Sequence, residues 1–209
     1  MRSCLLILAI SLFWNLGFAQ EVKMDAAEIK AFKSLVEKTS QATMTIKSDF
    51  VQYKHLDFLD NDIKTSGQLT FKAPSLVKWE YTDPYKYSVI FKEEKLLIND
   101  GGTKSNVDIG SSKMFKKLNE FIVNSVKGNM FYTEDFEIYY LKTATSNKVI
   151  FTPKDKKLAE YIASFELLFN KEDASVEEVK MIEPSTDFTR IVFTNRVLNS
   201  PIQDAVFSN

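Results

Sequence analysis

Few side chains in this 209-residue sequence could carry catalysis or bind a metal. His55 is the only histidine, and no nucleophile motif accompanies it, so a Ser-His-acid triad is not indicated. We interpret His55 as a side chain near solvent at the end of a strand. The nearby Asp57, Asp60 and Asp62 lack the glycine and the distal glutamate of an EF-hand loop and are typical of a solvated turn. The residue types therefore predict neither an enzyme nor a metal site.

Cofactor and nucleic-acid binding are not indicated either. The segment Asn99–Gly102 predicts a hairpin and not a phosphate loop, because neither a Gly-Lys-Ser/Thr nor a Gly-x-Gly-x-x-Gly pattern follows it. Cys4 is the only cysteine, so a zinc ion would have to rely on carboxylates almost alone. With 27 basic and 28 acidic residues and a net charge of −1, the chain lacks the basic composition of a nucleic-acid binder.

The first 19 residues have the order of a secretory signal peptide. A basic start at Arg2 is followed by an apolar run over residues 5–14 and by small residues at Gly17 and Ala19. We expect cleavage between Ala19 and Gln20, which leaves residues 20–209 as one domain without cysteine and hence without disulfides. A membrane anchor is the alternative, but the run is shorter than the roughly 20 residues that a spanning helix needs.

Hydrophobic periodicity predicts the elements that must position any site. A helix is expected to begin with a capping box at Asp25 and Glu28 and to keep Ile29, Phe32 and Val36 on one face until about Ser40. Beyond it, apolar and polar residues alternate in short segments separated by turns, which is typical of an antiparallel meander. These segments lie around residues 50–53, 69–72, 77–81, 87–91, 136–140, 149–151, 165–169, 176–182 and 191–193.

One segment interrupts the meander. Between Ser112 and Lys127 the apolar residues share one helical face, and Gly128 can end the helix. That face comprises Met114, Phe115, Leu118, Phe121, Ile122 and Val126. A short helix or turn is also expected at residues 154–159, after Pro153.

Several motifs resemble the periplasmic outer-membrane lipoprotein carrier family, LolA. The most specific is the block Gly67–Tyr81, with sequence GQLTFKAPSLVKWEY, which Phe50-Val51-Gln52 precedes and Asp83-Pro84 follows. Three later segments resemble elements of the same family in the same order: Phe151–Lys154, Thr189–Phe193 and Ile202–Phe207.

The resemblance implies a mostly β fold with helices: an incomplete, strongly curved antiparallel β-barrel, covered by the N-terminal helix and by a mid-chain lid helix. Its concave interior would hold lipoprotein acyl chains in transit through the periplasm, between an inner-membrane lipoprotein-releasing ABC transporter and an outer-membrane acceptor. We expect a monomer without cofactors. The expected acyl-binding wall comprises Phe50, Leu69, Phe71, Val77, Trp79, Tyr81, Val89 and Phe91. The expected lid comprises Met114, Phe115, Leu118, Phe121 and Ile122.

Two positions depart from the family pattern. Members of the family carry Arg directly before the motif proline and Phe three residues after it, whereas this chain has Ala73 and Val77. The departures leave open a carrier of another lipid-like ligand. Two further alternatives are an envelope interaction module whose sheet interior is filled by its own side chains, and a lipid-processing enzyme that uses His55.

Overall fold

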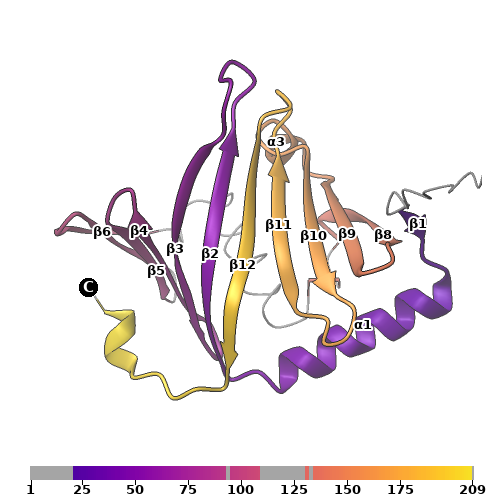
Figure 1. The fold of residues 1–209 in the computed structure, drawn as a ribbon, viewed down its shortest axis with the longest axis horizontal. Helices are drawn as coiled ribbons and strands as arrows, with labels where there is room; N and C mark the ends of the chain where they lie inside the picture. The colour runs from indigo at the N-terminus through magenta and orange to yellow at the C-terminus, as the bar shows by residue number, and fades with distance from the viewer. Residues whose placement is uncertain (1–20, 93–94, 109–129, 132–133, 209) are drawn as a thin grey trace, which may run out of the picture.

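The computed structural model describes residues 21–92, 95–108, 130–131 and 134–208. Within these ranges, twelve strands form a single antiparallel sheet that α1 crosses on one side (Figure 1). The strands are β1 (Val22–Lys23), β2 (Thr45–His55), β3 (Ile63–Lys72), β4 (Leu76–Asp83), β5 (Tyr87–Lys92), β6 (Lys95–Asp100), β7 (Thr103–Asp108), β8 (Phe136–Lys142), β9 (Ser146–Pro153), β10 (Ser164–Asn170), β11 (Val176–Ile182) and β12 (Phe188–Leu198). The helical segments are α1 (Ala26–Gln41), α3 (Lys156–Ala159) and the 3-10 turn η1 (Asp204–Phe207).

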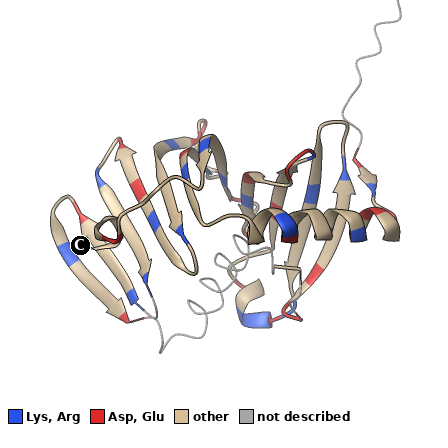
Figure 2. Ribbon diagram, turned by 90° about the horizontal axis from the view of Figure 1, so that it is seen from below, with Lys and Arg blue, Asp and Glu red and all other residues tan. Residues whose placement is uncertain are grey.

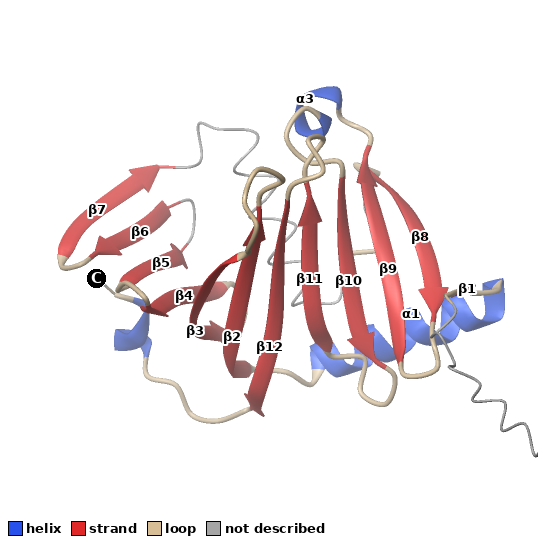
Figure 3. Ribbon diagram, turned by 45° about the horizontal axis from the view of Figure 1, so that its top comes forward, coloured by secondary structure: helices blue, strands red, loops and turns tan. Residues whose placement is uncertain are grey.

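The first strand, β1, lies at one edge of this sheet, and after α1 the chain re-enters the sheet near its middle with β2. Strands β2 to β7 run outward to one edge, and β8 to β12 return from the other edge until β12 pairs with β2. The sheet curves around α1, and its edge strands β1 and β7 do not pair with each other (Figure 3). The expected incomplete, curved antiparallel barrel with an N-terminal helix is therefore confirmed. The expected lid residues Met114, Phe115, Leu118, Phe121 and Ile122 lie outside the described residues, as does the signal peptide over residues 1–19.

The capping box predicted for α1 is present. The Glu28 amide donates to Asp25 Oδ1 at 2.8 Å, and the Asp25 amide donates to Glu28 Oε2 at 3.0 Å. These two reciprocal hydrogen bonds satisfy two backbone amides at the start of the helix. Such amides have no acceptor within the helix itself. The helix then buries Phe32 and Val36 against the sheet, as the periodicity predicts.

An aromatic core, which we define as Phe32, Phe131, Phe151 and Phe169 with their buried neighbours, fills the space between α1 and strands β8 to β10. The Phe32 ring lies 5.1 Å from Phe169 in an edge-to-face arrangement and 5.6 Å from Phe131. Phe151 and Phe169 are fully buried. Such contacts add specific ring–ring attraction to the burial of apolar area, so this end of the sheet holds a dense hydrophobic core.

The C-terminal segment covers the opposite face of the sheet. Ile202, which precedes η1, and Phe207, the last residue of η1, pack against Ile90 of β5, whose side chain points away from α1. The Lys72 ammonium also donates to the Ile202 carbonyl at 2.8 Å. The segment Ile202–Phe207, whose pattern resembles the family's last element, thus anchors the chain end on the convex side.

The hairpin predicted at Asn99–Gly102 is confirmed, because it joins β6 and β7. Gly101 and Gly102 have positive φ angles of 55° and 103°, and Asn99 Oδ1 accepts a hydrogen bond from the Gly102 amide at 2.9 Å. Strand β7 itself was not predicted. Each of its side chains is exposed, so no apolar alternation marks it in the sequence.

Candidate functional site

A cavity of about 350 Å³ lies between the second half of α1 and the concave face of the central strands. This volume falls within the range of roughly 300–1,000 Å³ typical of small-molecule sites. Its wall combines side chains from α1 and from two groups of strands, β2 to β4 and β10 to β12. The apolar members of the wall are Val36, Ile46, Leu69, Phe71, Val77, Trp79, Phe165, Leu167, Phe169, Ala174, Val176, Val179, Met181, Ile191, Phe193 and Leu198.

The period of the strands explains why these side chains converge. In β12, Ile191 and Phe193 face the cavity, whereas Val192, which lies between them, and Arg190, which precedes them, face outward. The same alternation in β10 directs Phe165, Leu167 and Phe169 inward. Successive side chains of a strand point to opposite faces of the sheet. Strands in which every second residue is apolar therefore form a continuous apolar surface where no other element packs against that face.

Four of the eight expected acyl-binding residues line this cavity: Leu69, Phe71, Val77 and Trp79. Phe50 does not. It is almost fully buried, with its ring 4.6 Å from Trp79 and 5.3 Å from Tyr81, so it supports the wall from the side. An acyl-binding role for any of these residues remains a prediction.

Tyr81, Val89 and Phe91 lie on the same face as the wall but outside this cavity. Val89 pairs with Trp79, and Phe91 pairs with Val77, so their side chains share the concave side of the sheet. The Tyr81 hydroxyl donates to Gln52 Oε1 at 2.9 Å. Burial raises the pKa of Tyr81 above its ordinary value, so the phenol remains neutral at physiological pH.

Close packing between strands explains why the motif block begins with a glycine, Gly67. Gly67 pairs with Phe50 across β2 and β3, and a Cβ at this position would lie 1.9 Å from the Glu80 carbonyl oxygen and 2.8 Å from the Phe50 ring. A larger residue would displace the backbone of β4 or the Phe50 ring. Gly67 therefore allows the close approach that holds Phe50 under Trp79.

The two departures from the family pattern have different surroundings. Val77 is almost fully buried and lines the cavity. Ala73 lies in the turn between β3 and β4, where its amide donates to the Met44 carbonyl at 2.8 Å. Its methyl side chain cannot form the ion pair or hydrogen bond that an arginine could form at this turn.

The strands after residue 160 contribute a large part of the wall, and none of their residues was among the expected acyl-binding residues. Val179, Ile191 and Phe193 are examples, together with the charged residue Arg196. Their alternation identifies them as strand residues. What brings them to the cavity is the pairing of β12 with β2, and no pattern in the sequence indicates that pairing.

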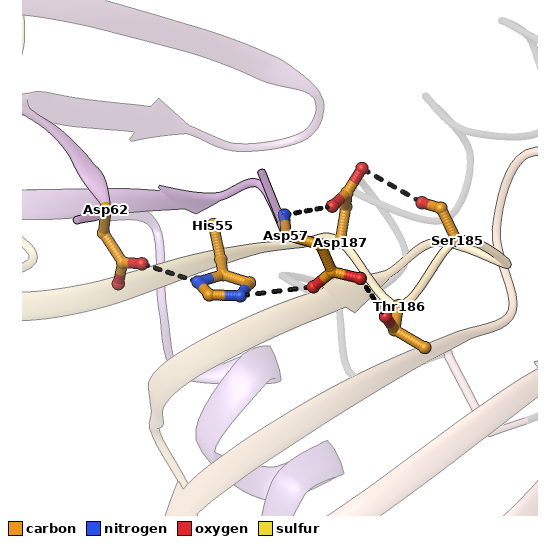
Figure 4. A network of polar contacts seen from close by, with 6 residues as sticks. All are labelled: His55, Asp57, Asp62, Ser185, Thr186 and Asp187. Carbon is orange, nitrogen blue, oxygen red and sulfur yellow. Dashed lines mark hydrogen bonds and ion pairs between the residues drawn. The ribbon is translucent and has the colours of Figure 1, made fainter. Parts of the chain in front are cut away.

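A separate polar cluster surrounds His55, the last residue of β2 (Figure 4). His55 Nδ1 lies 2.8 Å from Asp62 Oδ1, and Nε2 lies 3.4 Å from Asp57 Oδ1. Thr186 Oγ1 donates to Asp57 Oδ2 at 2.6 Å, and the Asp57 amide donates to Asp187 Oδ1 at 2.9 Å. The cluster thus joins the β2–β3 hairpin to the turn between β11 and β12.

The geometry of this cluster does not support catalysis. Ser185 Oγ donates to Asp187 Oδ2 at 3.1 Å rather than to His55, so no nucleophile is paired with the imidazole (Figure 4). The hydrogen bond from the Asp57 amide is the main reason why the pKa of Asp187 is lowered. None of these residues lines the cavity. His55 is a half-buried strand-end residue, as predicted, and the cluster braces two turns.

Figure 2 shows Lys and Arg interspersed with Asp and Glu along α1 and the strands. In the described part of the chain, no group of three or more His, Cys, Asp or Glu side chains could hold a metal ion. No helix in that part combines the length and the apolar character that crossing a membrane requires.

Comparisons with known proteins agree with this architecture. The family model described as "Outer membrane lipoprotein carrier protein LolA" matches residues 41–209. A search of curated proteins gave no match. A crystal structure of an uncharacterized conserved protein from Thermus thermophilus matches with a TM-score of 0.53 at 9% identity, and the match covers 86% of this chain and 91% of that chain.

The complex of MucA and MucB from Pseudomonas aeruginosa also contains a similar chain. Its TM-score is 0.50 at 9% identity, and the match covers 86% of this chain and 61% of that chain. At such low identity, both structural likenesses concern the fold alone.

Proposed function

The chain belongs to the family of the outer membrane lipoprotein carrier protein LolA, and from that premise we propose that it shields the acyl chains of lipoproteins in the periplasm. In this proposal the chain carries them from the inner to the outer membrane. It receives its cargo from a lipoprotein-releasing ABC transporter and delivers it to an outer-membrane acceptor. It acts as a monomer, after cleavage of a signal peptide near Ala19 and Gln20.

The observation that carries the proposal is the open apolar cavity. Exposing an acyl chain to water costs about 0.8 kcal/mol per CH₂, so transfer across an aqueous compartment requires an apolar enclosure. The cavity of about 350 Å³, bounded by Trp79, Ile191 and Phe193, provides such a surface. An interaction module with a filled interior would not need this space. The proposal includes no catalytic step, in keeping with a family that is named for a carrier.

A second candidate is a carrier of a different lipid-like ligand. It is favoured by Ala73 and Val77, which replace the arginine and phenylalanine of the family pattern. Val77 presents a smaller apolar surface to the cavity than phenylalanine would, and Ala73 offers no donor. Mass spectrometry of lipid that copurifies with the exported protein distinguishes the two candidates, because each predicts a different cargo.

Binding of a fluorescent fatty acid to the delipidated protein tests whether the cavity accepts acyl chains. In the exported protein, which the proposed cleavage near Ala19 frees of Trp14, Trp79 is the only tryptophan, and we expect its emission to shift to shorter wavelength as ligand replaces water beside it. Ile191→Asp introduces a charge into the cavity wall and is expected to weaken binding of the probe at least about tenfold.

The matched control is Val192→Asp on the same strand. Val192 faces outward, so this variant should retain the affinity of the unmodified protein. Absence of probe binding, or equal loss of binding in the two variants, would contradict the proposed function.

A further inference from the structure

Among the described residues that line the cavity, Arg196 is the one charged side chain, and a β-bulge directs it inward. In the pairing of β12 with β2, Thr194 lies opposite Asp49 and Val197 lies opposite Lys47. Asn195 and Arg196 therefore both face the single residue Ser48. Without this extra residue, the alternation that directs Phe193 inward would direct residue 196 toward solvent.

Specific contacts hold the bulge in place. Asn195 adopts a positive φ of 51°, and its side-chain amide donates to Asp49 Oδ2 at 2.8 Å. Ser48 Oγ donates to the Thr194 carbonyl at 2.8 Å. A left-handed backbone at a non-glycine residue is unfavourable and persists only where the surroundings fix it. The orientation of Arg196 is thus built into the strand rather than adopted by a free side chain.

Only part of the hydrogen-bonding capacity of Arg196 is used. Its Nη2 donates to the Val176 carbonyl, and a guanidinium has five N–H donors. Among the described residues, no carboxylate forms an ion pair with it. The nearby carboxylates have other partners: Asp173 Oδ1 accepts from the Ser175 amide at 2.8 Å, and Glu177 Oε1 accepts from Asn170 at 2.8 Å.

Burial lowers the pKa of Arg196, and the charges of Asp173 and Glu177 oppose that change. The guanidinium nevertheless keeps its charge at any physiological pH, because arginine does not deprotonate in proteins. The cavity therefore presents a permanent, partly desolvated positive charge within a mainly apolar wall.

Several other polar groups of the wall lie on elements near this arginine, whereas Thr189 lies toward the other end of β12. Thr39 near the end of α1 donates from Oγ1 to the Asp173 carbonyl at 2.7 Å, and the Thr43 hydroxyl donates to the Thr39 carbonyl at 2.7 Å. Thr39, Thr43 and Ser175 line the cavity together with Arg196. The end of α1, the β10–β11 turn and the β12 bulge thus form one polar end of an apolar cavity, which suits an amphipathic ligand.

We propose that Arg196 binds an oxyanion at the head of an acyl chain whose hydrocarbon part lies against the apolar wall. The inference rests on the second candidate of the proposed function, a carrier of another lipid-like ligand, because the acyl chains of a lipoprotein are held in ester and amide bonds and carry no oxyanion. Arginine suits this role because its planar fork of donors matches a carboxylate or a phosphate. Within this chemistry, a free fatty acid supplies a carboxylate and a lysophospholipid supplies a phosphate.

The test compares cis-parinaric acid with its methyl ester, which has the same chain but no charge. We expect the unmodified protein to bind the acid about tenfold more tightly or better. Arg196→Met should reduce the affinity for the acid to that for the ester, while the affinity for the ester stays within about twofold. Arg196→Lys should restore part of the preference. Displacement of the probe by unlabelled fatty acid or by lysophosphatidic acid then identifies the preferred head group.

Arg190→Met is the matched control, because Arg190 lies on the same strand, faces outward and pairs with Glu178 at 2.7 Å. It should leave the preference for the acid unchanged. Equal binding of acid and ester by the unmodified protein would overturn the role of Arg196 and leave the proposed function standing; this comparison does not require any variant to fold. Failure of both ligands to bind would instead overturn the proposed function.

Discussion

Two regions on the same face of one sheet differ in how they are filled. At the β8–β10 end, Phe32 of α1 meets Phe169 at a ring distance of 5.1 Å, and the aromatic core leaves its rings almost no exposed surface. One turn later along the same helix, Val36 borders the cavity, across which Trp79 and Ile191 form the opposite wall. The difference indicates that packing at one end supplies stability, which allows the other end to remain hollow for a ligand.

Truncation of a core ring should have the largest effect. Phe151→Ala removes a fully buried ring of the core that packs against Phe131 and Phe136 and does not line the cavity, and we expect it to lower the free energy of unfolding by about 3–5 kcal/mol. Leu69→Ala, at the half-buried cavity wall, should cost no more than about 2 kcal/mol, since fewer neighbours lose contacts. Urea unfolding of both variants measures the contrast. Equal losses would show that the two regions are packed alike.

Enlarging a valine in each region should have opposite consequences. Val149→Trp in the core has no free volume to occupy, and overpacking should destabilise the protein by about 1–3 kcal/mol. Val179→Trp projects into the cavity and should change stability by less than about 1 kcal/mol while weakening binding of a fluorescent fatty acid. Thermal unfolding and probe titration measure both effects. A Val179→Trp variant that unfolds as readily as Val149→Trp would contradict the distinction.

The N-terminal cap of α1 should affect the core end alone. Asp25→Ala removes the side chain that accepts from the Glu28 amide at 2.8 Å, and we expect a loss of about 1 kcal/mol in the free energy of unfolding. The affinity for an acyl probe should not change, because the cavity borders the other half of the helix, around Val36 and Thr43. A decrease in affinity comparable to that of a wall variant would mean that the two regions are coupled through α1.

The smallest expected effect is a dependence on pH at the core end. Glu28 forms an ion pair with Lys142 of β8, and the hydrogen bond from Lys142 is the main cause that lowers the pKa of Glu28 below its ordinary value of 4.5. A carboxyl whose pKa is lowered by folding stabilises the protein above that ordinary value, and this contribution is lost as the pH falls through the lowered value.

Glu28→Gln should remove this contribution while keeping a side chain able to complete the cap. Unfolding of both proteins between neutral and acidic pH should therefore show a smaller difference in stability at the acidic end. A difference that stays constant over this range would exclude the ion pair as its source.

The sequence was sufficient to predict most secondary-structure elements, and half of the expected wall residues do line the cavity. It did not indicate which other strands complete the cavity wall. Leu69, Phe71, Val77 and Trp79 were identified through a motif block, and they line the cavity because β3 and β4 are neighbours in sequence and in space. Most of the remaining wall comes from β10 to β12, which begin only at Ser164. No local pattern indicates that these strands return to β2, because alternation specifies which face a residue takes and not which strand it pairs with.

By itself, the sequence determined the local features of this protein: the capping box at Asp25 and Glu28, the alternation of the strands and the hairpin at Asn99–Gly102. Each depends on contacts within a few residues, so its signal is contained in a short segment. The tertiary structure alone decided that β12 joins β2, that a bulge turns Arg196 into the cavity, and that one end of the concave face is packed while the other is open. These features depend on one added residue in the β12–β2 strand pair and on how elements far apart in the sequence are spaced in the fold. Hydrophobic periodicity encodes neither.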